Sequence, residues 1–123
     1  MSFVKFTANP KNETNDCIIR SIAKATDRPW QDVMKEMCDI AIEMYLMPNN
    51  SEVIEEYMYR RKKFVYSPSN PTTIQQFAAE NPVGRFVICG EDHAIAIVDG
   101  DWYDLNDSAN TMVVDFYHVE AGI

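Results

Sequence analysis

The stretch "NDCIIRSIAKAT", residues 15–26, places a cysteine at the start of an amphipathic helix. Its apolar residues recur at helical spacing and form one wide face: Ile18, Ile19, Ile22, Ala23 and Ala25. Cys17 follows Asn15 and Asp16, two residue types that cap helices. The positive end of a helix dipole favours a thiolate over a thiol. The pattern predicts either a small buried residue at position 17 or a nucleophile, and a nucleophile needs a base from elsewhere in the chain.

Two charged neighbours are expected to act on Cys17 in opposite directions. Arg20, one turn further along, favours the thiolate if its side chain points back. Asp16 disfavours it, because an adjacent carboxylate raises the pKa of a thiol, unless its side chain caps the helix and turns away.

A second stretch, "HAIAIVDGDWYDLNDS" at residues 93–108, predicts a β-hairpin. Asp99-Gly100 lies between two runs rich in β-branched and aromatic residues, which is the strongest short hairpin signal. If these two residues form a type I′ loop, Val98 pairs with Asp101, and the rest of the ladder follows by counting outward.

His93 begins this hairpin and is one of only two histidines, the other being His118. Counting along the ladder places Asn106 opposite His93, about 5 Å away, and Asp104 diagonal to it, about 7–8 Å away. Asp107 points away from His93 unless the loop is one residue longer. The chain therefore offers a base and three residues that could orient its ring, and the ladder leaves the choice among them open.

The remaining pattern predicts a single α+β domain over residues 1–123, with helices first and strands last. We expect helices at 17–26, from Pro29 to about 45, at about 51–63, and a short one whose capping box is Thr72 and Gln75. We expect strands at 85–89, 93–99, 101–106 and 111–119. The expected architecture is a helical part, about 15–80, packed on a C-terminal antiparallel meander, about 85–119.

Composition and charge restrict the classes of partner and location. The chain has 123 residues, 46% hydrophobic and 24% charged, which suits one globular core. Its net charge of −8 disfavours nucleic acid and anionic membranes as partners, because like charges repel. Neither a signal peptide nor a run approaching ~18 apolar residues is found. With three widely spaced cysteines, a reducing compartment is favoured, and we expect a cytoplasmic protein.

The other cysteines suggest structural roles. Cys38 falls on the apolar stripe of the second helix and is expected in the core. Cys89 and His93 have a spacing that could seed a zinc site with Cys17, but the chain lacks the paired C-x2-C spacing of such sites. We therefore expect neither a metal nor another cofactor.

Residues 15–26 and 93–108 together resemble the papain-like cysteine peptidase superfamily, above all its small phage-encoded members with an Asn-Asp-Cys helix start and a His…Asp-Gly…Tyr-Asp hairpin. The likeness covers about residues 12–30 and 92–108. It implies a papain-like fold and a phage protein that acts in the host bacterial cytoplasm on a protein or peptide.

The resemblance also implies roles for individual residues. Cys17 corresponds to the nucleophile, His93 to the base, and Asp104 or Asp107 to the acidic third member, where papain has an asparagine. For the oxyanion the superfamily uses a polar amide shortly before the cysteine. Papain-type members have a glutamine six residues upstream, where this chain has Lys11. This departure leaves the oxyanion role to Asn15 or Asn12, and Asn15 also suits a plain helix cap.

Two functions of different classes follow. The first is a thiol hydrolase of the peptidase or amidase class, in which Cys17 attacks a carbonyl, His93 transfers the proton, and water or an amine resolves the acyl-enzyme. The second is a non-catalytic acidic protein on the same fold that blocks a basic surface of a host protein. Its interface would comprise "SEVIEE" (51–56) and the carboxylates Glu91, Asp92, Asp99 and Asp101. Replacing Cys17 with alanine would abolish the first function and spare the second.

Overall fold

The computed structural model describes residues 1–8 and 16–120. These residues form an α+β fold, which confirms the expected class. In chain order the elements are β1 (Phe3–Lys5), α1 (Cys17–Thr26), α2 (Trp30–Met44), α3 (Ser51–Glu55), the π-helix η1 (Glu56–Arg61), β2 (Val65–Pro68), α4 (Ile74–Glu80), β3 (Arg85–Gly90), β4 (His93–Val98), β5 (Asp101–Asp104) and β6 (Asp115–Val119). No helix within these described ranges is long and apolar enough to cross a membrane.

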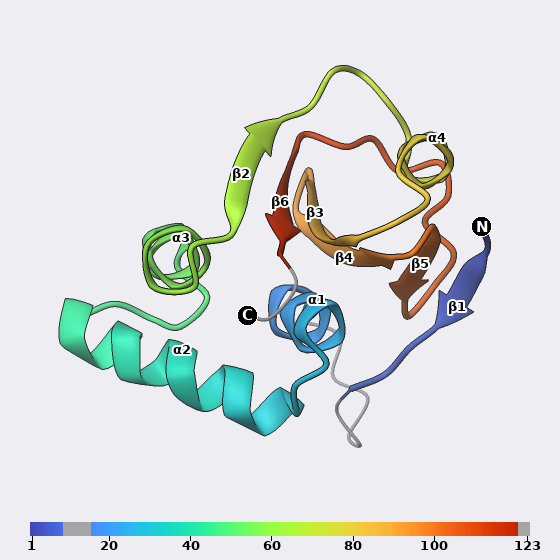
Figure 1. The fold of residues 1–123 in the computed structure, drawn as a ribbon. Helices are drawn as coiled ribbons and strands as arrows, with labels where there is room; N and C mark the ends of the chain where they lie inside the picture. Colours follow the sequence, from blue (N-terminus) through green and yellow to red (C-terminus); the bar gives the residue numbers. More distant parts are fainter. Residues whose placement is uncertain (9–15, 121–123) are drawn as a thin grey trace.

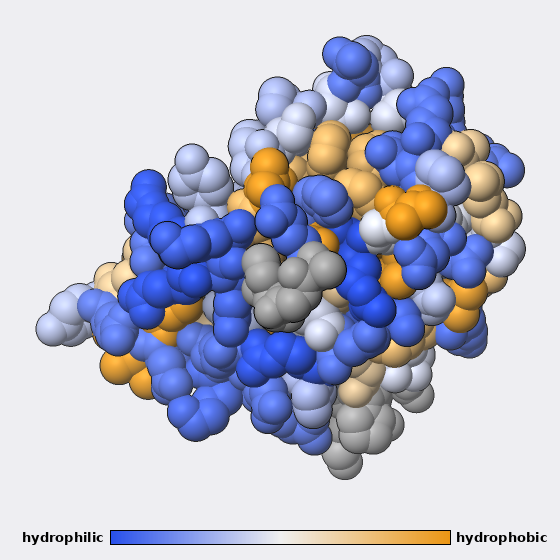
Figure 2. Space-filling model, viewed as in Figure 1, coloured by the Kyte–Doolittle hydropathy of each residue, from blue (hydrophilic) through white to orange (hydrophobic). Residues whose placement is uncertain are grey.

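The described strands form one mixed sheet in the order β1-β5-β4-β3-β6-β2. Helices α1, α2, α3 and η1 pack over one face, and α4 covers the other (Figure 1). The sheet therefore separates two apolar clusters, a larger one under α1 and a smaller one under α4. On the side of the molecule seen in Figure 2, hydrophilic residues cover most of the surface, with smaller apolar areas between them.

Strand β4 positions α1 through the alternation of small and large side chains in "HAIAIV". Ile95 and Ile97 belong to the cluster under α4, whereas Ala96 belongs to the cluster under α1. Because side chains alternate along a strand, Ala94 lies on the same side as Ala96. Alanines on this side leave room for α1 to pack directly along β4. The N-terminus of α1 is thereby brought to the start of β4.

The predicted hairpin forms with the predicted register. Asp99 and Gly100 have φ values of 50° and 83°, as a type I′ turn requires, and Val98 pairs with Asp101. Ile97 then faces Trp102. The turn residues thus determine which residues of β5 lie beside the start of β4.

The expected C-terminal antiparallel meander was wrong in three respects. Strand β6 pairs with β3 and not with β5, β1 pairs with β5 in parallel, and β2 lies at the other edge although it falls in the part expected to be helical. Strands β1 and β2 have only three and four residues, and β2 includes Pro68, so neither gives a periodic signal. The pairing of β6 is a long-range choice that local pattern does not specify.

The helices follow their predicted positions closely. α1 covers the expected 17–26, and α2 begins directly after Pro29. The third helix continues beyond Glu55 as a π-helix. The capping box of α4 is shifted by one residue, because Thr73 and not Thr72 accepts a hydrogen bond from the backbone N–H of Gln76.

Replacing Gly100 with alanine tests the role of the turn. A Cβ at φ 83° is strained and would lie 3.1 Å from the Met1 Cγ. We expect Gly100→Ala to lower the free energy of unfolding by about 1 kcal/mol. Asp99→Asn is the matched control, because asparagine tolerates a positive φ and keeps the acceptor for the Gly84 N–H. Urea unfolding measures both, and equal stability of the two variants would contradict the prediction.

Candidate active site

The structure brings Cys17, His93 and Asp104 together at the end of the hairpin opposite its turn. They come from the first turn of α1, the first residue of β4 and the last residue of β5. The His93 Nε2 lies 2.7 Å from the Asp104 Oδ2. The imidazole also acts on the Cys17 thiol, because each of the two groups shifts the pKa of the other. Because Nε2 is engaged with Asp104, Nδ1 is the ring nitrogen left for Cys17.

The surroundings of Cys17 lower the pKa of its thiol. The interaction with the His93 imidazole has the largest effect, and partial burial acts against it. The backbone N–H of Ala94 and the positive charges of His93 and Arg20 lower the pKa of the thiol further. These interactions favour a thiolate at Cys17.

The imidazole of His93 retains its proton. Its hydrogen bond with Asp104 and, next, its bond with Cys17 raise the pKa of His93 to about 9, against the opposing effect of burial. Burial raises the pKa of Asp104, but hydrogen bonds from His93 and from the Leu105 N–H outweigh it, so the pKa of this carboxyl is lowered. These shifts favour the form of the site in which Cys17 is a thiolate, His93 an imidazolium and Asp104 a carboxylate.

The buried guanidinium of Arg20 bridges the carboxylates of Asp16 and Asp104. The Arg20 Nη1 lies 2.6 Å from the Asp16 Oδ1, and its Nη2 lies 3.2 Å from the Asp104 Oδ1. All three side chains are buried, with Arg20 only 2% exposed. From the sequence, Arg20 was expected only to favour the Cys17 thiolate, and its hydrogen bond with Asp104 was not predicted. The available signal was the spacing of Asp16 and Arg20, which suits an ion pair one helical turn apart.

Asp16 does not cap α1, so that alternative was wrong. Its Oδ2 accepts a hydrogen bond of 2.9 Å from the Trp30 Nε1, at the start of α2. Its other oxygen pairs with Arg20. The positive charge of Arg20 compensates the carboxylate next to Cys17, which removes the opposition expected from the sequence.

Of the three candidates for orienting His93, Asp104 is the one bonded to its ring. Asp107 instead accepts hydrogen bonds from the Trp102 Nε1 and the Ala109 N–H, both at 3.0 Å, and so stabilises its own turn. Asn106 is exposed. The type I′ turn keeps Asp104 diagonal to His93, and β5 ends at Asp104, so Asn106 and Asp107 lie beyond the strand.

The oxyanion candidates Asn15 and Asn12, like Lys11, lie outside the described residues. The backbone supplies a further donor. The N–H of Cys17 belongs to the first turn of α1, where N–H groups have no acceptor within the helix. The Asp16 side chain makes no cap bond to this turn.

Cys38, Cys89 and His118 do not belong to the group formed by Cys17, His93 and Asp104. Cys38 is half-buried on α2 and outside the main apolar cluster, so the expected core position was wrong. His118 stacks on Phe86, with ring centroids 4.8 Å apart. Burial, followed by the charge and hydrogen bond of Asp115, raises the pKa of Cys89 to about 12. Among residues 1–8 and 16–120, no three His, Cys, Asp or Glu side chains gather as a metal site would need.

No protein-family model, curated protein or solved structure matches the chain. The likeness to papain-like peptidases therefore stays a prediction, and the geometry of Cys17, His93 and Asp104 is what bears on function.

Removal of the Arg20 guanidinium leaves two buried carboxylates without their cation. We expect Arg20→Met to lower the free energy of unfolding by about 3–5 kcal/mol, because it leaves buried carboxylates with no cation to compensate their charge. Lys35→Met removes an exposed cation from its pair with Asp39 and should change stability little. Urea unfolding compares the two, and similar stabilities would show that the buried bridge is not a major contributor.

The ring titration of His93 tests the electrostatics directly. We expect its NMR resonances to titrate near pH 9 in the wild type. Asp104→Asn should shift this midpoint to lower pH, because the carboxylate that stabilises the imidazolium is lost while Arg20 remains nearby. A wild-type His93 midpoint close to the ordinary value of about 6.5 would contradict the assignment.

Proposed function

We propose that the protein is a papain-like thiol hydrolase of the peptidase or amidase class, with Cys17 as nucleophile, His93 as general acid and base, and Asp104 as the residue that orients His93. The observation that carries the proposal is the His93 ring, which lies 2.7 Å from the Asp104 carboxylate and lowers the pKa of the Cys17 thiol. A pKa lowered at the thiol and raised at the imidazole is the combination that this chemistry requires.

The first half of the reaction forms an acyl-enzyme. The Cys17 thiolate attacks the carbonyl carbon of an amide, and the π electron pair moves to the carbonyl oxygen. The backbone N–H of Cys17 donates to that oxyanion, with Asn15 as the side-chain donor suggested by the sequence. The His93 imidazolium then gives its Nδ1 proton to the leaving amine as the C–N bond breaks, which leaves a thioester on Cys17.

The second half releases the acid and restores the ion pair. Neutral His93 takes a proton from water, and the resulting hydroxide attacks the thioester carbonyl. Collapse of the tetrahedral intermediate expels the Cys17 thiolate, with the proton remaining on His93. Asp104 keeps Nε2 protonated throughout, so that Nδ1 is always the atom that exchanges a proton with the substrate.

Contacts of the hairpin carboxylates weigh against the alternative of a purely acidic binding protein. Asp101 accepts from the Ser2 N–H and pairs with the N-terminal ammonium group of Met1. Asp99 accepts from the Gly84 N–H. Two of the carboxylates that such an interface would present therefore already have partners within the fold.

The alkylation rate of each cysteine against pH tests the proposal. We expect iodoacetamide to modify Cys17 rapidly well below the ordinary thiol pKa of about 8.5, as measured by peptide mass spectrometry. Cys38 and Cys89 are internal controls, and Cys89 should react slowly because its pKa is raised to about 12. His93→Ala should abolish the fast reaction of Cys17 at neutral pH.

His118→Ala is the matched control, because it removes the other imidazole from a position on β6 away from Cys17. It should leave the alkylation rate of Cys17 unchanged. If Cys17 reacts as an ordinary thiol, or if His93→Ala leaves its rate intact, the hydrolase proposal fails and the binding function gains support.

A further inference from the structure

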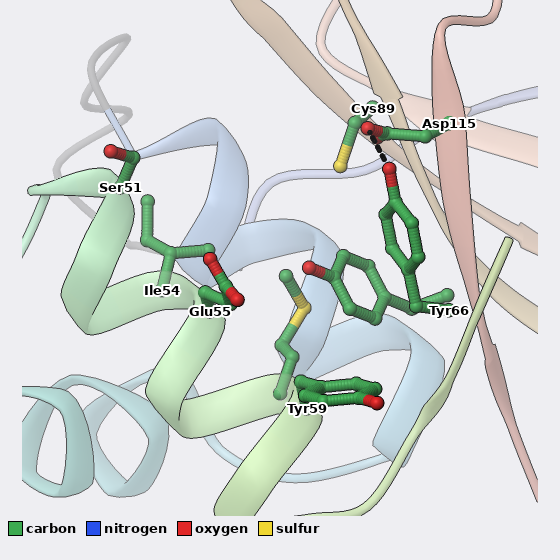
Figure 3. A pocket seen from close by; sticks show the side chains of 9 residues that line it. Ser51, Ile54, Glu55, Tyr59, Tyr66, Cys89 and Asp115 are labelled. Carbon is green, nitrogen blue, oxygen red and sulfur yellow. Dashed lines mark hydrogen bonds between the residues drawn. The ribbon is translucent and has the colours of Figure 1, made fainter. Parts of the chain in front are cut away.

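A cavity of about 590 Å³ opens between the helical segment α3–η1 and the strands β2, β3 and β6. Figure 3 shows Glu55 on the helical wall and Cys89, Tyr66 and Asp115 on the strand wall. Met58, Tyr59 and Tyr117 also line the cavity. This space, named here the acidic cavity, is distinct from Cys17 and His93, which do not line it.

The acidic cavity begins one strand away from the candidate nucleophile. Helix α1 packs on β4, and the Ala94 N–H at the start of β4 contributes to the lowered pKa of the Cys17 thiol. Ala94 pairs with Cys89 on β3, and Cys89 pairs with Asp115 on β6. Neighbouring strands lie about 4.8 Å apart, so Asp115 is about 10 Å across the sheet from Ala94. A long side chain can therefore enter the cavity from a peptide whose carbonyl lies at Cys17.

Two carboxylates face this space from opposite walls. The hydrogen bond with Asp115 raises the pKa of Tyr66 and burial raises that of Tyr117, and the negative charges of Asp115 and Glu55 add to both shifts. Asp115 accepts a hydrogen bond of 2.9 Å from the Tyr66 hydroxyl (Figure 3). Within residues 1–8 and 16–120, neither carboxylate forms a salt bridge.

Other carboxylates of the same helical region do have cationic partners. Glu36 pairs with Arg28 and Lys62, and Glu56 pairs with Arg61. Arg28, Arg61 and Lys62 are thus paired with carboxylates outside the acidic cavity. Glu55 and Asp115 remain available to a cation supplied by a ligand.

The rest of the lining suits a long cationic side chain. Ile54 is half-buried in the lining and offers apolar surface to an aliphatic stem. The rings of Tyr59 and Tyr66 are half-exposed at the cavity and can contact a cation through their faces. Cys89 contributes a neutral thiol, since its pKa is raised to about 12.

We propose that the acidic cavity binds the side chain of a lysine or arginine in a peptide, next to the carbonyl that Cys17 attacks. The attack rests on the proposed hydrolase function, whereas the binding of the basic side chain does not. The aliphatic stem lies against Ile54 and the tyrosines, and the charged end lies between Glu55 and Asp115. The substrate class of the enzyme is therefore a peptide with a basic residue at the cleaved or modified bond.

Binding is tested first without any chemistry, in the Cys17→Ala protein. Acetyl-Gly-Lys-Gly-amide and the same peptide with norleucine in place of lysine are titrated, and amide NMR shifts of Cys89, Asp115 and Tyr117 are followed. Norleucine keeps the stem and removes the charge. We expect the lysine peptide to bind about tenfold more tightly, as one half-exposed ion pair and one cation–π contact provide.

The carboxylates themselves are tested by substitution. Glu55→Gln, alone and combined with Asp115→Asn, should remove the preference for lysine over norleucine. Glu80→Gln is the matched control, because it removes the same charge from α4 on the opposite face of the sheet and should keep the preference. Equal binding of the two peptides by the parent Cys17→Ala protein, or a preference that survives Glu55→Gln with Asp115→Asn, would overturn the inference.

A second measurement separates this inference from the proposed function. Wild-type protein is alkylated with iodoacetamide and with chloromethyl ketones of the lysine and norleucine peptides. If Cys17 reacts as an ordinary thiol while the lysine peptide still binds selectively, the cavity inference stands and the hydrolase proposal fails. If Cys17 reacts rapidly but equally with both ketones and the binding preference is absent, the hydrolase proposal stands and the cavity inference fails.

Discussion

The buried guanidinium of Arg20 is the interaction on which the candidate site depends. It lies between the carboxylates of Asp16 and Asp104 and so connects the first turn of α1 to the last residue of β5. Removing water from three charges is costly unless each finds its partner, so partial arrangements are strongly disfavoured. The helix that carries Cys17 and the carboxylate that holds His93 are therefore fixed relative to each other by one side chain.

The position of α1 on the sheet makes this bridge possible. Cys17 and Arg20 are three residues apart and lie on neighbouring parts of the same helix face. The small side chains of Ala94 and Ala96 allow that face to approach β4, and the Ala94 N–H contributes to the lowered pKa of the Cys17 thiol. A larger residue at either position would push α1 away from β4 and so separate the Cys17 thiol from the His93 imidazole.

The parts of the site that sequence could predict are those specified by local chemistry. Asp99 and Gly100 adopt positive φ, which determines the hairpin register and hence the diagonal placement of Asp104 beside His93. The choice of Asp104 over its neighbours was not accessible, because it depends on side-chain contacts that only the folded loop reveals. The bridge from Arg20 to Asp104 spans 84 positions, and the neighbours of β6 are likewise long-range, so no local periodicity encodes them.

Cys17 on α1 and Cys89 on β3 show how the fold gives two cysteine side chains different chemistry. Cys17 receives donors, the His93 imidazolium and the Ala94 N–H, and these favour its thiolate. Cys89 is more deeply buried and faces the carboxylate of Asp115, which favours its neutral thiol. Negative charge at Cys17 adds to the raised pKa of Cys89, after burial and Asp115. The pKa of Cys17 is lowered in an acidic chain because nearby groups act at short range, whereas solvent screens the net charge of −8 over longer distances.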